Sequence, residues 1–227
     1  MAATAALMDD DKLVAQTVIN HNRTHSQKMM PQIESMFELA ERDITEVDCF
    51  AAAAGPGSFT GVRIGIATAK AFAQACQKPC AAISTLEALA NNNVLFDGII
   101  SPILDARRGQ VYNALFGGGE LKRLCGDRAI ALTALLTELK EQDRPVLFCG
   151  DGVYAFKEEI IKNLGDTAVF ARRMNNMNLA ASVAELGIKA YESGNTIPYG
   201  ELVPQYIRLS QAERERLEKQ NNSKGTK

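Results

Sequence analysis

Ala54-Gly-Pro-Gly-Ser-Phe-Thr-Gly-Val-Arg-Ile-Gly65 is the stretch that decides the fold of this chain. It follows a run of small apolar residues, 49–54, and it precedes a regular apolar pattern that continues to residue 77. That order predicts a strand, a tight glycine loop and a helix over 61–77. Glycines in the loop allow backbone angles that a side chain would forbid, and Ser58 or Thr60 is placed to cap the helix.

A glycine loop before a helix has two ordinary uses. One is anion binding by aimed amides at the positive helix end, and the other is a close-packed turn beside a helix that approaches another helix. The loop lacks the Gly-Lys-Ser/Thr of a P-loop, and its glycine spacing misses the dinucleotide fingerprint. We therefore favour the packing role, with anion binding as the alternative, for the structural glycine loop Gly55, Pro56, Gly57, Ser58, Phe59, Thr60 and Gly61.

Composition limits the protein class. The 227 residues suit one large domain or two compact lobes, and the formal net charge of −2 provides no broad basic field for unaided nucleic-acid binding. Five cysteines without a Cys-x-x-Cys spacing indicate reduced thiols. We expect a cytoplasmic protein without a signal peptide, because no apolar run approaches the roughly 20 residues that span a bilayer.

Periodicity predicts strands that alternate with helices, which is an α/β class. In the first half we expect a hairpin at 1–20, a helix at 26–42, strands at 47–53 and 80–83, and a capped helix at 85–92. In the second half we expect a hairpin at 99–116, helices at 133–142, 154–164 and 178–192, strands at 146–149 and 168–171, and an extended edge segment at 202–207.

The loop string resembles the signature of the bacterial tRNA-modification family TsaB, also called YeaZ. Five further stretches agree in order: His25-Ser-Gln-x-Met-Met-Pro31, Ile83-Ser-Thr-Leu-Glu-Ala-Leu-Ala90, Leu104-Asp-Ala-Arg-Arg-Gly-Gln-Val-Tyr112, Gly150-Asp-Gly152 and Pro204-Gln-Tyr-Ile-Arg208. A single motif such as Gly-Asp-Gly is weak, but the ordered set is specific, and it extends over nearly the whole chain.

The resemblance implies an actin-like ATPase-superfamily fold of two RNase-H-like lobes. We expect a first lobe at 1–97 that is completed by 200–211, a second lobe at 98–199, and a frayed or disordered tail at 212–227. Relatives open with a strand that carries an Asp-Thr phosphate motif before the hairpin, whereas this sequence begins partway through. The first strand of the amino-terminal lobe is therefore expected to be missing or shortened.

The resemblance also implies a function. This family supplies a non-catalytic scaffold subunit of the machinery that makes N6-threonylcarbamoyladenosine in tRNA. It pairs with the transferase TsaD, helps recruit the P-loop ATPase TsaE, and reaches tRNA only through the complex. We expect no cofactor, catalytic residue or metal in this chain, since ATP and metal are expected on the partner subunits. We also expect a homodimer when the chain is alone, and no membrane contact. The alternative is a metal-dependent glycoprotease-like hydrolase.

Two polar groupings test these expectations. His21 and His25 have a His-x-x-x-His spacing, which suits a metal site only with a third ligand, so a capping His25 is the simpler interpretation. Asp105, Arg107 and Tyr112 lie around one turn, where a charge pair that pins a hairpin is favoured over a phosphate site. In actin-like folds this turn carries an Asp-x-Gly, so Arg107 in place of the glycine indicates an eroded nucleotide site.

Helix 61–77 is the best candidate for a partner contact. Small residues at three- and four-residue spacing give it a smooth face, which allows helix axes to approach closely. The alternative is that both faces are internal. The predicted partner surface, with helix 26–42, consists of Met29, Met30, Ile33, Ile64, Gly65, Thr68 and Phe72.

Overall fold

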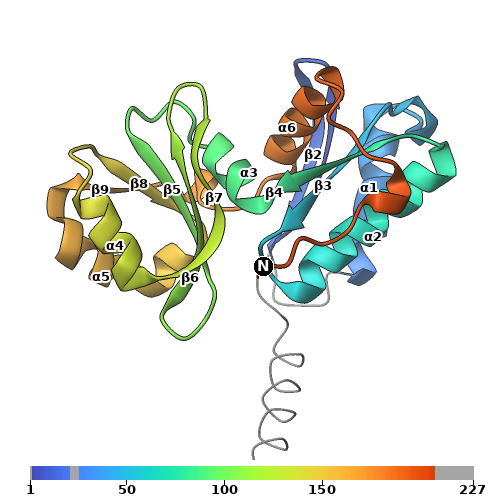
Figure 1. The fold of residues 1–227 in the computed structure, drawn as a ribbon. Helices are drawn as coiled ribbons and strands as arrows, with labels where there is room; N and C mark the ends of the chain where they lie inside the picture. The colour runs from blue at the N-terminus through green and yellow to red at the C-terminus, as the bar shows by residue number, and fades with distance from the viewer. Residues whose placement is uncertain (1, 21–25, 208–227) are drawn as a thin grey trace, which may run out of the picture.

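The computed structural model describes residues 2–20 and 26–207, which form two α/β lobes side by side (Figure 1). This arrangement confirms the predicted α/β class. The first lobe contains β1 (Ala3–Asp9), β2 (Lys12–Ile19), α1 (Ser26–Ala40), β3 (Phe50–Gly55), α2 (Phe59–Cys76) and β4 (Cys80–Ser84). Most predicted bounds are within a few residues of these.

The first lobe has two separate sheets. β1 and β2 form an antiparallel hairpin, and β3 and β4 form a parallel pair. Over the part of the chain that the structure describes, no strand pairing joins β1 to β3. Among the described strands, β1 and β3 therefore each pair with a single neighbour.

Helices cover both faces of these sheets. α6 (Ala180–Glu192) packs on one face of β1, β3 and β4, whereas α1 packs on β1 and β2 and α2 packs on β3. Both faces of β3 are therefore covered, which explains its run of alanines. A Cβ at Gly187 of α6 would lie 2.6 Å from the Cβ of Ala51, so this close approach requires glycine.

The second lobe is built on one five-stranded sheet. It contains β5 (Ile99–Asp105), β6 (Gln110–Gly117), β7 (Lys122–Ala131), α4 (Leu132–Lys140), β8 (Val146–Cys149), α5 (Gly152–Leu164) and β9 (Ala168–Phe170). The strand order is β7-β6-β5-β8-β9, with β7, β6 and β5 antiparallel and β5, β8 and β9 parallel. Short 3-10 turns lie at Ile44–Glu46, Gly165–Thr167, Arg173–Asn175 and Tyr199–Glu201.

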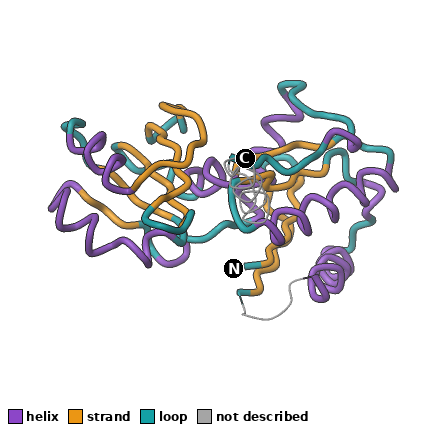
Figure 2. The backbone as a smooth tube through the Cα atoms, turned by 60° about the horizontal axis from the view of Figure 1, so that its bottom comes forward, coloured by secondary structure: helices purple, strands orange, loops and turns teal. Residues whose placement is uncertain are grey.

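Two helices at the junction pack on a different lobe from the one predicted for them. α3 (Thr85–Asn91) was assigned to the first lobe, but its Leu86 and Leu89 are buried with Ile100 and Phe116 of the second. α6 was assigned to the second lobe by the division at residue 199, but it packs on the sheets of the first. α3 and α6 contact each other and are labelled between the strands of the two lobes in Figure 1, and Figure 2 shows helices between the two groups of strands. Local periodicity did not show which sheet each of these helices covers.

Two segments differ from the sequence prediction. β7 was not predicted, because the first half of this edge strand is exposed and carries little apolar alternation. Residues 202–207 were expected to be an extended sheet edge, but they are not a strand. Leu202 is buried in the core of the first lobe, and the Gln205 amide donates to the Ala54 carbonyl over 2.7 Å. Residues 208–227 lie outside the described residues.

Candidate functional site

The glycine loop packs against the returning carboxy-terminal segment. Gly55 has a φ of +128°, and a Cβ there would lie 2.5 Å from the Gln205 carbonyl oxygen. Ser58 caps α2, since its Oγ accepts a hydrogen bond from the Gly61 amide over 3.4 Å. The Gly55–Pro56 peptide is cis. These contacts support the packing role of the loop, because the close neighbour of Gly55 is the backbone of Gln205.

Aromatic stacking fixes the outer side of the loop. The Phe59 and Tyr206 rings stack with centroids 4.9 Å apart, and the Arg63 guanidinium lies 3.7 Å above the Phe59 centroid. The Arg63 Nε–H donates to the Tyr206 hydroxyl over 2.7 Å. Sequence reasoning did not predict this cluster, because Tyr206 is distant in sequence and only its motif had been noted.

A large cavity separates the two sheets of the first lobe. Its volume is about 1330 Å³, and it is lined by residues 2–9, by residues 49–53 and by side chains of α1, α2 and α6. It continues into the junction between the lobes, where Asp105, Arg107 and Asp151 line it. The glycine loop borders the same cavity through residues 56–59 and 61.

The predicted partner residues gather along this cavity. Met29 and Ile33 of α1 line it, as do Gly65, Thr68 and Phe72 of α2, and all five are half-buried. We call these five residues the helix groove. Met30 is outside the groove and 51% exposed, and Ile64 is half-buried without lining it. A Cβ at Gly65 would meet nothing within 4 Å, so no internal close contact accounts for that glycine.

Acidic side chains lie at the junction end of the cavity. Asp151 Oδ1 accepts a hydrogen bond from the Asp105 amide over 3.1 Å. Desolvation by the surrounding walls raises the pKa of the Asp151 carboxyl, and the nearby Asp105 charge adds to this increase. The Arg107 side chain makes an exposed ion pair of 3.5 Å with Asp105, which supports the predicted hairpin-pinning role. Arg107 adopts a φ of +67°, a backbone conformation that favours glycine.

Polar groups near Asp151 were missed by sequence reasoning. The Gly150 amide donates to Asn176 Oδ1 over 2.8 Å, and Thr85 Oγ1 and Asn178 Oδ1 are buried without a partner within the described residues. All four residues line the cavity. The Gly150-Asp-Gly152 motif was the one available signal, and it gave no indication of the asparagines that follow the second lobe's last strand.

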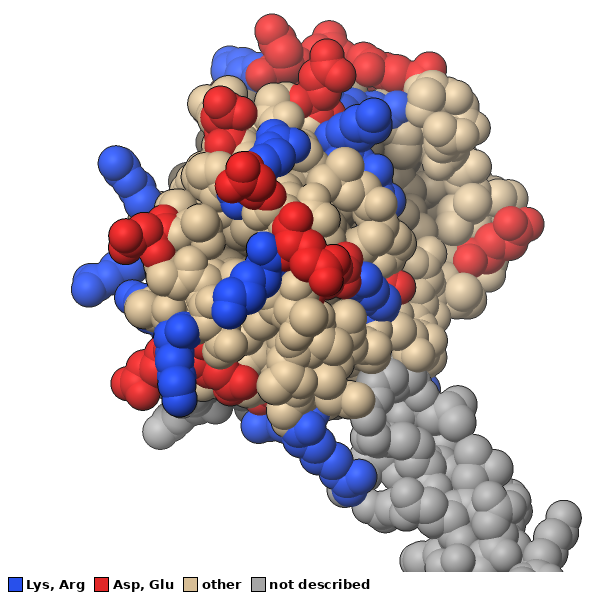
Figure 3. Space-filling view, turned by 60° about the vertical axis from the view of Figure 1, so that its left-hand side comes forward, with Lys and Arg blue, Asp and Glu red and all other residues tan. Residues whose placement is uncertain are grey.

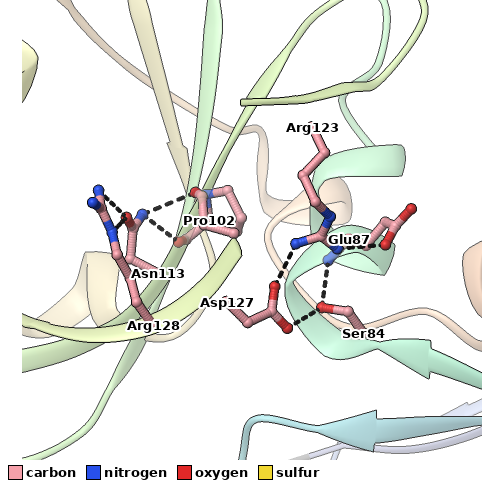
Figure 4. A network of polar contacts seen from close by, with 8 residues as sticks. Ser84, Glu87, Pro102, Asn113, Arg123, Asp127 and Arg128 are labelled. Carbon is pink, nitrogen blue, oxygen red and sulfur yellow. Dashed lines mark hydrogen bonds and ion pairs between the residues drawn. The ribbon is translucent and has the colours of Figure 1, made fainter. Parts of the chain in front are cut away.

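A polar network joins α3 to β7 at the junction (Figure 4). The Arg123 guanidinium binds Asp127 over 2.6 Å and Glu87 over 2.5 Å, and it lies 4.7 Å from the Phe116 ring centroid. The Ser84 hydroxyl donates to Asp127 over 2.5 Å, and its oxygen accepts the Glu87 amide over 3.3 Å. The helix predicted at 85–92 is therefore capped by Ser84, and the Glu87 side chain binds Arg123.

We expect Arg123→Ala to lower the free energy of unfolding by about 1 kcal/mol, since a half-exposed network contributes modestly. Arg123→Lys should recover only part of that loss, because an ammonium does not reproduce the two-pronged contact with Glu87 and Asp127. Urea unfolding of both variants beside the parent chain measures the difference. Equal midpoints for all three chains would show that the network does not stabilise the junction.

Charges are mixed on the surface. On the face shown in Figure 3, acidic and basic side chains are interspersed and no single sign covers the surface. None of the described helices combines the length and apolar character needed to cross a membrane. The described residues contain no group of three His, Cys, Asp or Glu side chains suited to a metal ion. His21 and His25 lie outside the described residues, so the prediction for that pair stays a prediction.

Comparison with known proteins identifies the family. The family model of TsaD, tRNA N6-adenosine threonylcarbamoyltransferase, matches residues 12–215. The tRNA threonylcarbamoyladenosine biosynthesis protein TsaB of Bacillus subtilis (strain 168) is 38% identical over 220 residues, which cover 95% of this chain and 93% of that protein. TsaB of Escherichia coli (strain K12) is 35% identical over 92 residues, or 40% of each chain.

Solved structures agree on the fold. A Pseudomonas aeruginosa protein described as similar to peptidase YEAZ superposes with a TM-score of 0.79 at 22% identity, covering 91% of this chain and 94% of that one. YeaZ from Pseudomonas aeruginosa superposes with a TM-score of 0.75 at 20% identity, covering 90% and 94%. The fold is therefore of the actin-like ATPase type, as predicted, and the chain belongs to the TsaB (YeaZ) family.

Proposed function

We propose that this chain takes part in threonylcarbamoyladenosine biosynthesis in tRNA as a non-catalytic scaffold subunit that pairs with the transferase TsaD and helps recruit the ATPase TsaE. Membership of the TsaB family supports the pathway. The scaffold role is supported by one observation in particular: the helix groove presents half-buried apolar and small side chains from two helices. Such a groove suits a helix of a partner.

The surface charges favour shared tRNA binding. The net charge is −2, and the face in Figure 3 carries both signs. Unaided nucleic-acid affinity depends on phosphate neutralisation by lysine and arginine, so we propose that tRNA binds through the complex. In the absence of TsaD, the same groove would support a two-fold homodimer, because self-association also removes apolar surface from water.

Co-purification with TsaD from the same organism tests the scaffold proposal. We expect a stable complex whose mass by light scattering corresponds to one copy of each chain, and TsaE should join it only when both are present. A complex that forms equally well without this chain, or TsaD activity on tRNA that does not depend on it, would contradict the proposal.

We predict that nucleotide binding by the isolated chain is weak. Arg107 occupies a turn position that favours glycine, and the chain lacks a Gly-Lys-Ser/Thr motif. Calorimetric titration with ATP and magnesium should show no binding tighter than about 1 mM, which corresponds to about −4 kcal/mol. A micromolar dissociation constant would mean that the junction cavity is a working nucleotide site.

We also predict that the purified chain holds no stoichiometric metal and hydrolyses no peptide. The candidate ligands are His21 and His25, and a metal site needs a third ligand. Elemental analysis of the parent protein and of the matched variant His25→Ala distinguishes the scaffold function from the hydrolase function. Stoichiometric zinc or iron that is lost in His25→Ala, together with lost peptide hydrolysis, would favour the hydrolase.

A further inference from the structure

Two aromatic rings and an arginine form an exposed cluster beside the start of α2. Phe59 and Arg63 lie in the first two turns of this helix, and Tyr206 belongs to the carboxy-terminal segment that runs alongside it (Figure 1). Phe59 is 36% exposed, Tyr206 is 45% exposed, and Arg63 is also exposed. We call these three residues the stacking cluster. It joins two of the stretches that the sequence analysis quoted, and none of its residues belongs to the helix groove.

The Arg63 guanidinium is held in place, but its charge has no acidic partner among the described residues. It lies 3.7 Å from the Phe59 ring centroid and 5.7 Å from the Tyr206 ring centroid, and its Nε–H donates to the Tyr206 hydroxyl. Within the same part of the chain it makes no ion pair, and its terminal NH2 groups donate no hydrogen bond. Arg123 differs, since two carboxylates bind its guanidinium. The stacking cluster therefore offers a positioned cation with unused donors.

This combination of groups suits a nucleotide. A guanidinium with free N–H groups binds the oxygens of a phosphate or a carboxylate, often through two parallel hydrogen bonds. Aromatic rings and guanidinium planes also stack on unpaired nucleobases, which is a common way in which proteins bind single-stranded RNA. A nucleotide supplies both a phosphate and a flat base, whereas an acidic side chain of a protein supplies only the oxygens. The exposed rings of Phe59 and Tyr206 therefore favour RNA over an acidic protein segment.

The stacking cluster stays accessible when the helix groove is occupied. At about 100° per residue, Arg63 lies about 160° around α2 from Gly65 of the helix groove. Arg63 does not line the cavity, although Phe59 and Tyr206 border it. A protein partner in the helix groove would contact the opposite side of α2, so it would leave the guanidinium open to RNA.

We propose that the stacking cluster binds one unpaired nucleotide of tRNA, with the phosphate on Arg63 and the base stacked on the exposed aromatic rings. This inference rests on the proposed function, because it names the contact that this chain adds to tRNA bound by the complex. The formal net charge of −2 leaves most of the phosphate neutralisation to the partner chains. One nucleotide contact therefore adjusts the affinity and position of tRNA in the complex, and the isolated chain binds tRNA weakly.

Titration of fluorescently labelled tRNA with the complex of the full-length chain and TsaD, at several salt concentrations, tests the inference. We expect Arg63→Ala to weaken tRNA binding about tenfold. The slope of log affinity against log salt should become less steep by about 0.7, which is the loss expected for one single-strand phosphate contact. Arg63→Lys should keep the parent slope but recover only part of the affinity, since an ammonium does not stack as a planar guanidinium does.

Two control variants separate this contact from a general effect of charge. Lys70→Ala removes one positive charge from the same helix, at a side chain that donates to the Gly200 carbonyl over 3.0 Å. Because it lies about 10 Å along α2 from Arg63, or about one Debye length, tRNA affinity should stay within about twofold of the parent. Tyr206→Leu removes a ring and no charge, so it should weaken binding about fivefold without changing the salt slope. Equal losses for Arg63→Ala and Lys70→Ala would overturn the inference.

Light scattering of each mixture shows which proposal an outcome concerns, and a thermal melt of Arg63→Ala should match the parent because the side chain is exposed. A parent chain that does not pair with TsaD would overturn the proposed function and this inference together. A stable complex in which Arg63→Ala binds tRNA as tightly as the parent, with the same salt slope, would overturn this inference alone. Weaker pairing of Arg63→Ala with TsaD or TsaE, at unchanged tRNA affinity, would also overturn it and would assign the stacking cluster to a protein carboxylate.

Discussion

Gly55→Ala is expected to lower the free energy of unfolding by about 2–6 kcal/mol. A backbone φ of +128° strains a residue with a side chain by about 1–3 kcal/mol. The added Cβ would also lie 2.5 Å from the Gln205 carbonyl oxygen, and such overpacking costs about another 1–3 kcal/mol. Because the contact is with backbone, a side-chain rotation does not relieve it. Urea unfolding of the purified variant measures the loss.

Gly57→Ala is the matched control in the same loop. Its added Cβ would lie 3.4 Å from a Val62 methyl group, and its φ lies outside the left-handed region, so the change should stay within about 0.5 kcal/mol. Equal losses for the two variants would contradict the packing role of Gly55. Wild-type stability for Gly55→Ala would also contradict it and would return anion binding to consideration.

The sequence was most informative where one local rule determined the structure. The glycine loop combines a small-residue strand, a Ser58 cap and an apolar helix period, and each of these depends on neighbouring residues. β5, β6 and β8 were predicted for the same reason, since buried strands read as apolar runs. Their bounds in the structure differ little from the prediction.

Features that depend on distant residues were not predicted. β7 pairs as an edge strand through its backbone, so its exposed half carries no apolar signal. The lobe assignment of α3 and α6 depends on which sheet each helix meets, and helical periodicity gives only the presence of an apolar face. Gly187 illustrates the limit: its need for glycine comes from Ala51, which is remote in sequence.

Five of the seven predicted partner residues line one cavity, and their role as an interface stays a prediction. Helix spacing indicated a smooth face on α2, and the structure has Gly65, Thr68 and Phe72 along one cavity. The sequence analysis grouped Met29 and Ile33 with these residues, and the structure has them along the same cavity, but the cavity itself depends on how α1 and α2 lie across two separate sheets. Asn176 and Asn178 were missed, since isolated asparagines are ordinary in loops.

Gly65→Leu is expected to weaken association with TsaD roughly ten- to a hundredfold while the lobe stays folded. A Cβ at Gly65 meets nothing within 4 Å, so the isolated chain has room for a side chain there, and its stability should change by about 0.5 kcal/mol or less. A partner helix in the helix groove would meet the added side chain, and overpacking there costs about 1–3 kcal/mol. Light scattering and a quantitative pull-down measure the association, and a thermal melt confirms the fold.

Ala67→Leu is the matched control, because it adds a leucine to the same helix at an exposed position. At 100° per residue, Ala67 lies about 200° around α2 from Gly65, on the side away from the groove. We expect Ala67→Leu to pair with TsaD as the parent chain does. Undiminished pairing of Gly65→Leu would remove the helix groove from the interface, and weakened pairing of Ala67→Leu alone would transfer the contact to the outward face of α2.

If the groove also forms the homodimer, Gly65→Leu should shift the isolated protein toward monomer in the same light-scattering experiment, whereas Ala67→Leu should not.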